Sequence, residues 1–472
     1  MDNNYQPVIG LEIHVELKTK SKMFCQCPAD YFGKPANTLI CPVCLGLPGA
    51  LPVPNKKAVE WTILLGQALD CRINKTSKFD RKHYFYPDLP KGYQISQYDE
   101  PIAIEGKIQI TNYKSQTNSK LQNLNLKKIR IQRVHLEEDT GKLIHKDNET
   151  LIDFNRSGVP LVEIVTEPDF DNADDVKRFL EELQVIIRYL GISEADMEQG
   201  SMRLEPNISV QKILSSKLQI PNKPQLLITK HQLPKYKVEV KNINSFRFVK
   251  QAIEYEIKRQ VELLEKGITP KQETRGFNPE KKITYSQRSK EEAHDYRYFP
   301  EPDIPPMVFN DRWLADIKKE MPELPQQRIT RFINEMRLKP ADAFLLTRDR
   351  ERSDYFESII LKIKRQKLRI PLKDQRIEQY IANLIINKKI ATDLSVDLFV
   401  KKAIEFLTPI KTDEKQLDKL ISQLIILNKK AVEDYKKGKE NAIMFLVGQV
   451  MRKLQGKGDV KKIIAKIKNK LT

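Results

Sequence analysis

Alternating polar and apolar residues recur along the first 300 residues and predict β-strands. In Leu11–Leu17 the odd positions are apolar, while Glu12, His14 and Glu16 occupy the even positions. Successive side chains of a strand point to opposite faces of its sheet, so these three polar groups share one face. Further runs show the same alternation, with polar positions at Arg133, His135 and Glu137; Glu163; Arg203, Glu205 and Asn207; and Glu239 and Lys241. The pattern predicts an antiparallel sheet with one buried face and one polar face.

Helical spacing appears twice in this region and dominates the rest of the chain. The first helix is predicted to begin after Asn172, a good N-terminal cap, and to end at Gly191. The second is predicted from Ser245 to Gly267, because apolar residues recur there every three or four positions. Beyond residue 300, Lys, Glu, Leu and Ile recur with the same spacing.

The proline-rich segment 299–306 suits neither a helix nor a central strand, so we predict a domain boundary there. Residues 113–124 and 215–235 have the composition of surface loops. The chain is therefore predicted to have an α+β fold: an antiparallel-sheet domain over residues 1–300, an all-α domain over 301–405 and a small all-α tail domain over 406–472.

Composition and charge narrow the class of protein. Hydrophobic residues make up 40% and charged residues 31% of the 472, which excludes a disordered or collagen-like chain. No apolar stretch approaches the ~18 residues of a membrane span, and residues 1–7 resemble neither a secretory signal nor a transit peptide. We therefore expect a cytoplasmic protein that is not bound to a membrane.

The 82 basic and 63 acidic residues give a net charge of +19, which favours nucleic acid as a partner. A lysine-rich coding bias is the alternative explanation of this charge.

The polar face of the predicted sheet is rich in carboxylates and imidazoles. Such groups suit hard divalent cations, and Mg²⁺ held partly by substrate phosphates is a common occupant in phosphoryl-transfer enzymes. A merely solvated face is the alternative. Between these strands, residues 81–94 combine aromatic and basic side chains, which can stack on a nucleotide or a tRNA end. An ordinary packed strand and turn would carry the same residues.

Four of the five cysteines form two close pairs. Cys25 and Cys27 are followed by Cys41 and Cys44, a spacing that matches a four-thiolate zinc site. Disulfides are the alternative, but they are uncommon in cytosolic proteins. Four thiolates leave no open coordination position, so the sequence predicts structural rather than catalytic zinc.

The C-terminal segment from Met451 to Thr472 is strongly basic. It holds eight Lys or Arg residues against Asp459 alone, beside a helical stripe of apolar residues. Clustered cations of this kind bind phosphate backbones, whereas the alternatives are a solvated helix face and an amphipathic membrane helix. The residues proposed to contact RNA are Lys453, Lys457, Lys461 and Lys462.

Ordered motifs spread over essentially the whole chain resemble the B subunit of the aspartyl/glutamyl-tRNA(Asn/Gln) amidotransferases. They are Val8–Leu17, the four cysteines with Gly46–Gly49, Tyr84–Asp88, Tyr93–Gln97, His135–Asp139, Asn155–Leu161, Arg288–Pro300 and Phe445–Met451. The sequence shows neither a phosphate-binding P-loop nor a dinucleotide-binding glycine turn. It also shows no sign of an amidase serine or a glutaminase cysteine.

The resemblance implies a fold and an activity. The fold would be a cradle domain related to glutamine synthetase with a zinc loop at about 25–44, then a helical domain and a tail that contacts tRNA. The activity would be ATP-dependent amidation of mischarged Glu-tRNA(Gln) or Asp-tRNA(Asn), with ATP, Mg²⁺ and structural Zn²⁺. The expected partners are a glutaminase (amidase) subunit, which supplies ammonia, and a third, small subunit, together forming a heterotrimer.

The resemblance also implies residue roles. The metal would be bound by His14, Glu137 and Glu163. Residues around ATP or the reacting carboxylate would be Glu12, Lys82, Arg203 and Glu205. Residues that position phosphate or substrate would be Tyr84, Lys241, Asn242 and Arg288. Some positions depart from the family pattern: Glu205 stands where Asp is usual, Phe277 and Asn278 replace Trp and Asp, and Gln287 replaces Met.

Two other functions are compatible with the residues. A non-catalytic, zinc-containing RNA-binding protein would explain the cysteines and the basic tail if the polar sheet face were only solvated. A stand-alone ATP-dependent ligase that takes free ammonia would explain the polar face without partner subunits.

Overall fold

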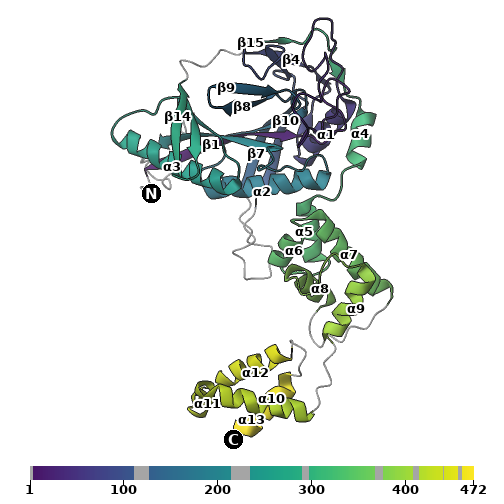
Figure 1. The fold of residues 1–472 in the computed structure, drawn as a ribbon, viewed down its shortest axis with the longest axis vertical. Helices are drawn as coiled ribbons and strands as arrows, with labels where there is room; N and C mark the ends of the chain where they lie inside the picture. The colour runs from purple at the N-terminus through teal and green to yellow at the C-terminus, as the bar shows by residue number, and fades with distance from the viewer. Residues whose placement is uncertain are drawn as a thin grey trace, which may run out of the picture. The chain divides into compact units, whose positions relative to one another are not determined.

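The computed structural model describes residues 4–110, 127–213, 234–289, 297–366, 376–407, 414–439, 441–454 and 460–471. The chain divides into two compact units, residues 1–328 and 329–472. Figure 1 colours them from purple at the N-terminus to yellow at the C-terminus. The predicted loop over 113–124, and all but the last two residues of the one over 215–235, lie outside the described residues.

The proline-rich segment 299–306 lies inside the first unit. Phe299 pairs with Arg81 and Pro300 with Asp80 in antiparallel strands, and Ile304 is buried in the core. These contacts attach the segment to the sheet region, so the first unit continues past the expected boundary at residue 300 and ends at residue 328. The division into three domains stays a prediction.

Nine described strands form the central sheet, in the order β14-β13-β12-β11-β1-β10-β7-β6-β2. They are β1 Tyr5–Glu16, β2 Arg72–Ile73, β6 Ala103–Ile110, β7 Lys127–Glu138, β10 Pro160–Thr166, β11 Met202–Lys212, β12 Val238–Lys241, β13 Glu273–Asn278 and β14 Ile283–Ser289. Three small sheets have the orders β15-β4-β5, β16-β3 and β8-β9. Their strands are β3 Thr76–Ser77, β4 Asp80–His83, β5 Tyr93–Ser96, β8 Lys142–Lys146, β9 Glu149–Asp153, β15 Arg297–Pro300 and β16 Met307–Val308.

The predicted antiparallel sheet needs one correction. Most described neighbours in the central sheet are antiparallel, but β12 and β13 pair in parallel. The physical reason is the connection between them: helix α3, Phe246–Glu265, crosses over from β12 to β13, and a crossover is the connection that parallel strands require. The fold is therefore a mixed α+β arrangement with a mainly antiparallel sheet.

The apolar face of the sheet packs against helices. Ile9, Leu11, Ile13 and Val15 of β1 are at most 1% exposed, as the alternation predicts. They belong to one core with residues of helices α1 (Lys56–Ala68), α2 (Ala173–Leu190) and α3, and Figure 1 shows α2 and α3 along one side of the sheet. The opposite face of β1 carries its polar residues and is not part of this core.

Both helices predicted in this region are confirmed. The Asn172 side chain accepts a hydrogen bond from the Asp175 N–H and caps α2, and Gly191 ends the helix with a φ of 69° that suits glycine. The Ser245 side chain caps α3 in the same way by accepting from Phe248 N–H. The first unit also contains α4, Asp311–Lys319.

The described residues of the second unit are all helical or irregular. The helices are α5 Pro325–Asn334, which begins in the first unit, α6 Pro340–Leu346, α7 Arg350–Arg365, α8 Ile377–Ile386, α9 Val396–Leu407, α10 Glu414–Leu427, α11 Lys429–Lys436, α12 Ala442–Lys453 and α13 Val460–Leu471. Helices α10, α12 and α13 share a core of their own that includes Ile421, Leu446 and Ile463. In the part of the chain that the structure describes, every helix is too short or too polar to span a bilayer.

Candidate metal centres on the polar face of the sheet

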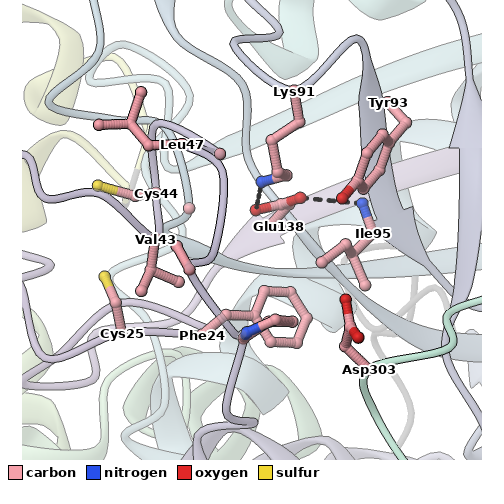
Figure 2. A pocket seen from close by; sticks show the side chains of 14 residues that line it. Phe24, Cys25, Val43, Cys44, Leu47, Lys91, Tyr93, Ile95, Glu138 and Asp303 are labelled. Carbon is pink, nitrogen blue, oxygen red and sulfur yellow. Dashed lines mark hydrogen bonds and ion pairs between the residues drawn. The ribbon is translucent and has the colours of Figure 1, made fainter.

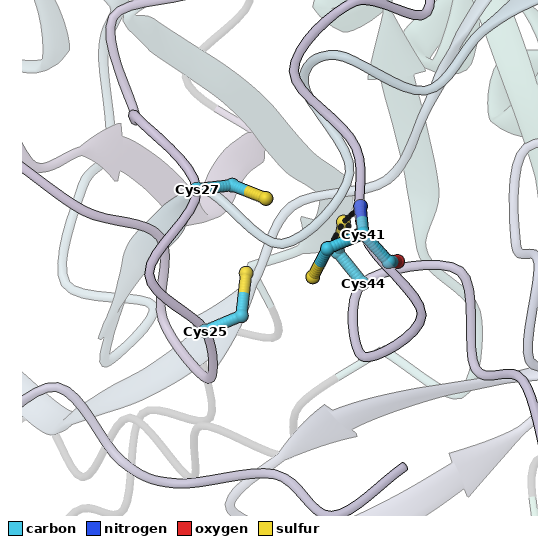
Figure 3. Close-up of side chains that lie close together, drawn as sticks. All are labelled: Cys25, Cys27, Cys41 and Cys44. Carbon is cyan, nitrogen blue, oxygen red and sulfur yellow. Dashed lines mark hydrogen bonds between the residues drawn. The ribbon is translucent and has the colours of Figure 1, made fainter.

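Cys25, Cys27, Cys41 and Cys44, which we call the cysteine quartet, converge on one point (Figure 3). Their sulfur atoms all lie within 4.8 Å of one another, and Cys41 Sγ and Cys44 Sγ are 3.8 Å apart. Sulfur atoms around a tetrahedral zinc, with Zn–S bonds of about 2.3 Å, are separated by about 3.8 Å. All four are free thiols, so the geometry fits zinc and not disulfides.

A buried lysine lies against the cysteine quartet. Lys22 is fully buried, and its Nζ lies 3.8 Å from Cys44 Sγ, 2.8 Å from the Leu39 carbonyl oxygen and 3.4 Å from that of Phe154. A hydrogen bond from the Cys25 thiol, helped by the charge of Lys22, lowers the pKa of Cys44 to about 5 although burial opposes the change. The loop therefore stabilises a thiolate, the form that binds zinc.

Further hydrogen bonds attach the loop of the cysteine quartet to the segment before β10. The Asn155 side chain accepts from the Leu39 N–H at 2.8 Å and donates to the Pro35 carbonyl at 2.6 Å. The Ser157 hydroxyl donates to the Cys44 carbonyl at 3.3 Å. The loop is thus tied to the sheet at several points and not only through its cysteines.

His14, Glu137 and Glu163, which we call the cation trio, come from three different strands and meet on the polar face. His14 of β1 is opposite Glu163 of β10 in the strand register, and Glu137 comes from β7, the other neighbour of β10. His14 Nε2 lies 3.5 Å from Glu137 Oε1 and 3.5 Å from Glu163 Oε2. Because cis ligands of an octahedral Mg²⁺ are about 3 Å apart, a small inward movement would seat such an ion.

The cation trio has the electrostatics of a site that attracts positive charge. Burial disfavours a charged imidazole, but a hydrogen bond to Glu163 and the charges of Glu163 and Glu137 raise the pKa of His14 to about 9. The trio carries two buried carboxylates, and in the absence of a cation a proton on His14 offsets part of their charge. The donor set of one imidazole and two carboxylates suits a hard or borderline divalent ion.

Lys82 reaches the cation trio from the small sheet β15-β4-β5. It lies on β4, opposite Tyr298 of β15 and Gln94 of β5. Burial works against its charge, yet Glu137 and, to a smaller degree, Glu163 raise the pKa of Lys82 above its ordinary value. A cation is therefore held beside the two carboxylates, where it can also meet an anionic substrate.

A second acidic group lies further along β1. Glu12, Glu205 and Glu239, which we call the outer acidic cluster, offer ligand atoms within 4.8 Å of one another. Lys241 Nζ lies 3.0 Å from Glu205 Oε2 and 3.5 Å from Glu239 Oε1. Glu12 is two residues from His14 on the same face, so this cluster lies about 7 Å along the strand from the cation trio.

Arg203 belongs to a third group, at the other end of β1. Its guanidinium contacts Asp139 Oδ2 at 2.5 Å and lies 3.9 Å from Glu16 Oε1, and Arg156 Nε lies 3.7 Å from the same aspartate. We call Glu16, Asp139, Arg156 and Arg203 the arginine cluster. Burial and the neighbouring Asp139 raise the pKa of Glu16 to about 8. Arg203 is thus engaged by buried carboxylates.

The remaining predicted residues are more scattered. Tyr84 is half-buried just after β4, with Lys82 Nζ 5.8 Å from its ring centre. Asn242 is exposed at the end of β12 and has a left-handed backbone with a φ of 61°. The backbone of Arg288 pairs with Thr274 in β14, and its side chain lies outside what the structure describes.

The tail lysines differ in their surroundings. Lys453 is exposed at the end of α12, and Lys461 and Lys462 are exposed at the start of α13. Lys462 forms an ion pair with Glu414 of α10. Lys457 lies outside the described residues.

A cavity of about 130 Å³ lies beside the cysteine quartet (Figure 2). Val43 and Leu47 line it, and at its polar end Lys91 Nζ lies 2.7 Å from Glu138 Oε2. The Ile95 N–H donates to the other oxygen of Glu138 at 2.9 Å. None of the described residues that line this cavity belongs to the cation trio or the outer acidic cluster.

Sequence reasoning did not assign several residues that the structure brings to these groups. His135 Nε2 lies 3.0 Å from Glu163 Oε2, and Glu239, Asp139 and Lys22 complete the other clusters. His135 and Glu239 were visible as polar positions of alternating strands. Asp139 directly follows β7 and was visible only as the last residue of the motif His135–Asp139, and Lys22 lies in the loop after β1 and carries no such signal.

Comparisons with known proteins agree with this arrangement. Residues 7–315 match the GatB/GatE catalytic domain family, and residues 358–471 match the GatB domain family. The chain is 45% identical to the B subunit of the aspartyl/glutamyl-tRNA(Asn/Gln) amidotransferase from Thermotoga maritima, over 96% of each chain. It is 44% identical to the corresponding protein of Thermotoga neapolitana, over 98% of this chain and 99% of the relative. For that of Carboxydothermus hydrogenoformans the identity is 42%, over 99% of both.

Proposed function

Because this chain belongs to the family of aspartyl/glutamyl-tRNA(Asn/Gln) amidotransferase B subunits, we propose that it converts the side-chain carboxylate of mischarged Glu-tRNA(Gln) or Asp-tRNA(Asn) into an amide at the expense of ATP. The observation that carries this proposal is the strand register that gathers the cation trio next to Lys82. The outer acidic cluster lies next to it on the same face. This is an arrangement for a charged substrate rather than a solvated surface.

The chemistry explains why such a site is needed. A carboxylate is too electron-rich for ammonia to attack, so it first displaces ADP from the γ-phosphoryl group of ATP and becomes an acyl phosphate. Ammonia then adds to the acyl carbon, and loss of phosphate and a proton leaves the amide. Both steps build negative charge on oxygen atoms, and preorganised cationic groups stabilise that charge.

The residues of the polar face suit these requirements. His14, Glu137 and Glu163 would hold Mg²⁺, which when bound supplies positive charge to the phosphate oxygens. Lys82, half-buried and close to the charges of Glu137 and Glu163, would contact the transferred phosphoryl group or the developing oxyanion. The outer acidic cluster, which includes Glu12 and Glu205, and the adjacent Lys241 would bind the nucleotide part of ATP.

The other predicted residues have supporting roles. Arg203 would position Asp139 and Glu16 at the end of the polar face, where the arginine cluster borders the zinc loop. Tyr84 precedes Phe85 and Tyr86, which are 84% and 54% exposed, so this turn can stack on the end of a tRNA. Asn242 and Arg288 remain candidates for substrate positioning.

The proposed cofactors are ATP with Mg²⁺ on the polar face and a structural Zn²⁺ in the cysteine quartet. Four thiolates close the coordination shell, so zinc would stabilise the loop and take no part in the amidation. We also infer that the first unit is a cradle related to glutamine synthetase, which carries out the same carboxylate activation.

The proposed partners are the other subunits of the amidotransferase. The matched relatives are named as B subunits, which implies an enzyme of several subunits. We propose a heterotrimer in which a glutaminase subunit supplies ammonia and a third, small subunit joins the pair. The core shared by α10, α12 and α13 gives the tail a scaffold on which its lysines can meet the tRNA backbone. A cytoplasmic location stays a prediction.

The decisive experiment replaces Glu137. In the assembled enzyme, Glu137→Ala should abolish ATP- and glutamine-dependent formation of amidated tRNA, while tRNA affinity stays within about twofold of the parent. Glu149→Ala, which removes an exposed carboxylate of β9, is the matched control. Retained amidation in Glu137→Ala would remove this residue from the proposed site.

A second experiment separates an enzyme component from a binding protein. The purified chain should bind mischarged tRNA alone but form glutamine-dependent product only when the glutaminase and the small subunit have both been added. Amidation by the chain alone with ammonium salts would instead indicate a stand-alone ligase. Failure to amidate under every condition, with tRNA binding intact, would indicate a non-catalytic RNA-binding protein.

A further inference from the structure

His135 is a buried imidazole next to the cation trio that neither the sequence motifs nor the comparisons assign a role. It is 3% exposed and lies on β7, directly opposite Glu163 of β10 in the strand register. Glu163 is opposite His14 on its other side. The three side chains therefore form a row across three neighbouring strands, with the carboxylate of Glu163 between two imidazoles.

The distances distinguish the two imidazoles. His14 Nε2 lies 3.5 Å from a carboxylate oxygen of Glu137 and 3.5 Å from one of Glu163, in the centre of the trio. His135 Nε2 lies 3.0 Å from Glu163 Oε2 but 3.9 Å from Glu137 Oε2. His135 is thus within hydrogen-bond distance of Glu163 and beyond that distance from Glu137. It does not belong to the group of described ligand atoms that all lie within 4.8 Å of one another, which is His14, Glu137 and Glu163.

The chemistry of an imidazole beside an ionised carboxylate determines the direction of this hydrogen bond. An ionised carboxylate can only accept, so the proton lies on Nε2 of His135. Such a bond orients the carboxylate and leaves its remaining lone pairs for another partner. In metalloproteins, hydrogen bonds from groups behind the ligands orient them and raise metal affinity.

A purely structural role for His135 is poorly supported. Its second nitrogen, Nδ1, is buried and has no hydrogen-bond partner among the described residues. An unpaired buried polar atom costs roughly the desolvation of that group, which a leucine of similar size would avoid. The hydrogen-bonding capacity of this imidazole is therefore used on one side only, in the contact that Nε2 makes with Glu163.

We propose that His135 is a positioning residue of the cation site, whose Nε2–H fixes the Glu163 carboxylate so that its free lone pairs face the ion. The proposal rests on the cation site described under the proposed function and adds a residue to it. His135 itself does not bind the ion. It restricts Glu163 to the one orientation in which Glu163, Glu137 and His14 can act together.

The test measures binding of Mn²⁺, a spectroscopic substitute for Mg²⁺, to the assembled enzyme by electron paramagnetic resonance. His135→Leu removes the donor, and His135→Asn moves the amide to the position of Nδ1. His135→Gln places an amide N–H near the position of Nε2. We expect Mn²⁺ affinity to fall 10- to 100-fold in the Leu and Asn variants and to recover to within about threefold in the Gln variant.

Two controls complete the experiment. His145→Leu, which removes an exposed imidazole of β8, should leave Mn²⁺ affinity unchanged. Thermal unfolding of every variant, recorded on the same samples, should show one cooperative transition like that of the parent, so that a loss of Mn²⁺ affinity reports on the site and not on loss of the fold.

Each outcome has a distinct meaning. Parent-like affinity in the Leu and Asn variants would overturn the role of His135 and leave the cation site intact. Equal weakening of the Gln and Leu variants would show that ring packing matters rather than the Nε2 hydrogen bond, and would also overturn it. Failure of the parent enzyme to bind Mn²⁺ at the trio would overturn the cation site itself, and with it the role of His135.

Discussion

The cysteine quartet and the cation trio are two candidate metal sites in one unit, built in different ways. The quartet comes from a single loop, residues 25 to 44, whereas the trio comes from strands that begin at residues 5, 127 and 160. The loop is too short to form a core of its own, so the proposed zinc would add to the hydrogen bonds that hold its shape. The trio is held by a sheet that is already stabilised by an extensive core. We therefore expect the cysteine quartet to depend on its metal for folding, and the cation trio to use a fold that exists without it.

The two sites also differ in how many positions they leave open. The four thiolates of the quartet would complete a tetrahedral shell, but the trio would supply only three ligands to an ion that takes about six. Each site has a lysine beside it: Lys22, which is buried next to Cys44, and Lys82, which is half-buried and interacts with the charges of Glu137 and Glu163. We propose that Lys22 only offsets charge in a closed zinc site, whereas Lys82 also meets the substrate.

Replacing one cysteine of the quartet should have the largest effect, and this effect should be on the stability of the first unit. We expect Cys44→Ser to lower the free energy of unfolding of the first unit by on the order of 5 kcal/mol, because the loop loses its ion. Thermal unfolding and zinc content measured on the same sample check this. Cys71→Ser, which changes a cysteine outside the quartet, is the control. An unchanged midpoint with zinc absent would contradict a structural role for the quartet.

Removing the lysine beside the trio should affect activity and not stability. We expect Lys82→Met to slow amidation by about 10²- to 10³-fold, since a preorganised charge at the reacting oxygens is lost. Zinc content should be unchanged. Steady-state kinetics at saturating ATP measure the effect, and Lys142→Met, on an exposed position of β8, serves as the control. A Lys82→Met enzyme with parental turnover would place the reaction elsewhere.

Removing the lysine beside the quartet should have a smaller effect, and the effect should be on zinc retention and not on catalysis. We expect Lys22→Met to accelerate zinc removal by a chelator about tenfold, because the thiolate of Cys44 loses the nearby charge. Amidation by the zinc-loaded enzyme should stay near the parental rate. Release can be followed with a chromogenic zinc indicator. If Lys22→Met lost activity and Lys82→Met lost zinc, the comparison between the two sites would be reversed.

The smallest effect is expected in the tail, where exposed lysines would attract the tRNA backbone by their charge alone. Lys453 is exposed, whereas Lys466 Nζ lies 2.9 Å from Asp418 Oδ1. We expect Lys453→Ala to reduce the slope of log affinity for tRNA against log salt by up to about 0.9, the value for one phosphate contact. Lys466→Ala should change the slope less. Equal slopes for both variants and the parent would argue against a tail that contacts the tRNA backbone.

The alternation of residues along the strands was enough to predict which side chains share the polar face. Leu11, Ile13 and Val15 are buried as expected, and His14 and Glu163 face each other across neighbouring strands. Both helix caps were predicted too, because capping depends on residues within one turn. Cysteine spacing is equally local, and the quartet converges as the spacing predicts.

Long-range pairing explains what could not be predicted. The sequence does not show that β1 lies between β10 and β11, nor that β12 and β13 are parallel. Phe299 and Pro300 looked like part of a boundary, but they pair with a strand more than 200 residues earlier. The contact of Arg203 with Asp139 depends on a turn that follows β7. These contacts are set by strand register across the sheet, which no local pattern encodes.

The most direct measurement is a crystal structure of the assembled enzyme soaked in Mn²⁺, with anomalous data collected at the manganese and zinc edges. The account predicts a zinc peak at the centre of the cysteine quartet and a manganese peak in contact with His14, Glu137 and Glu163. The zinc peak serves as the internal control for an intact fold. A zinc peak without manganese at the trio, or manganese bound elsewhere while these three side chains remain unengaged, would contradict it.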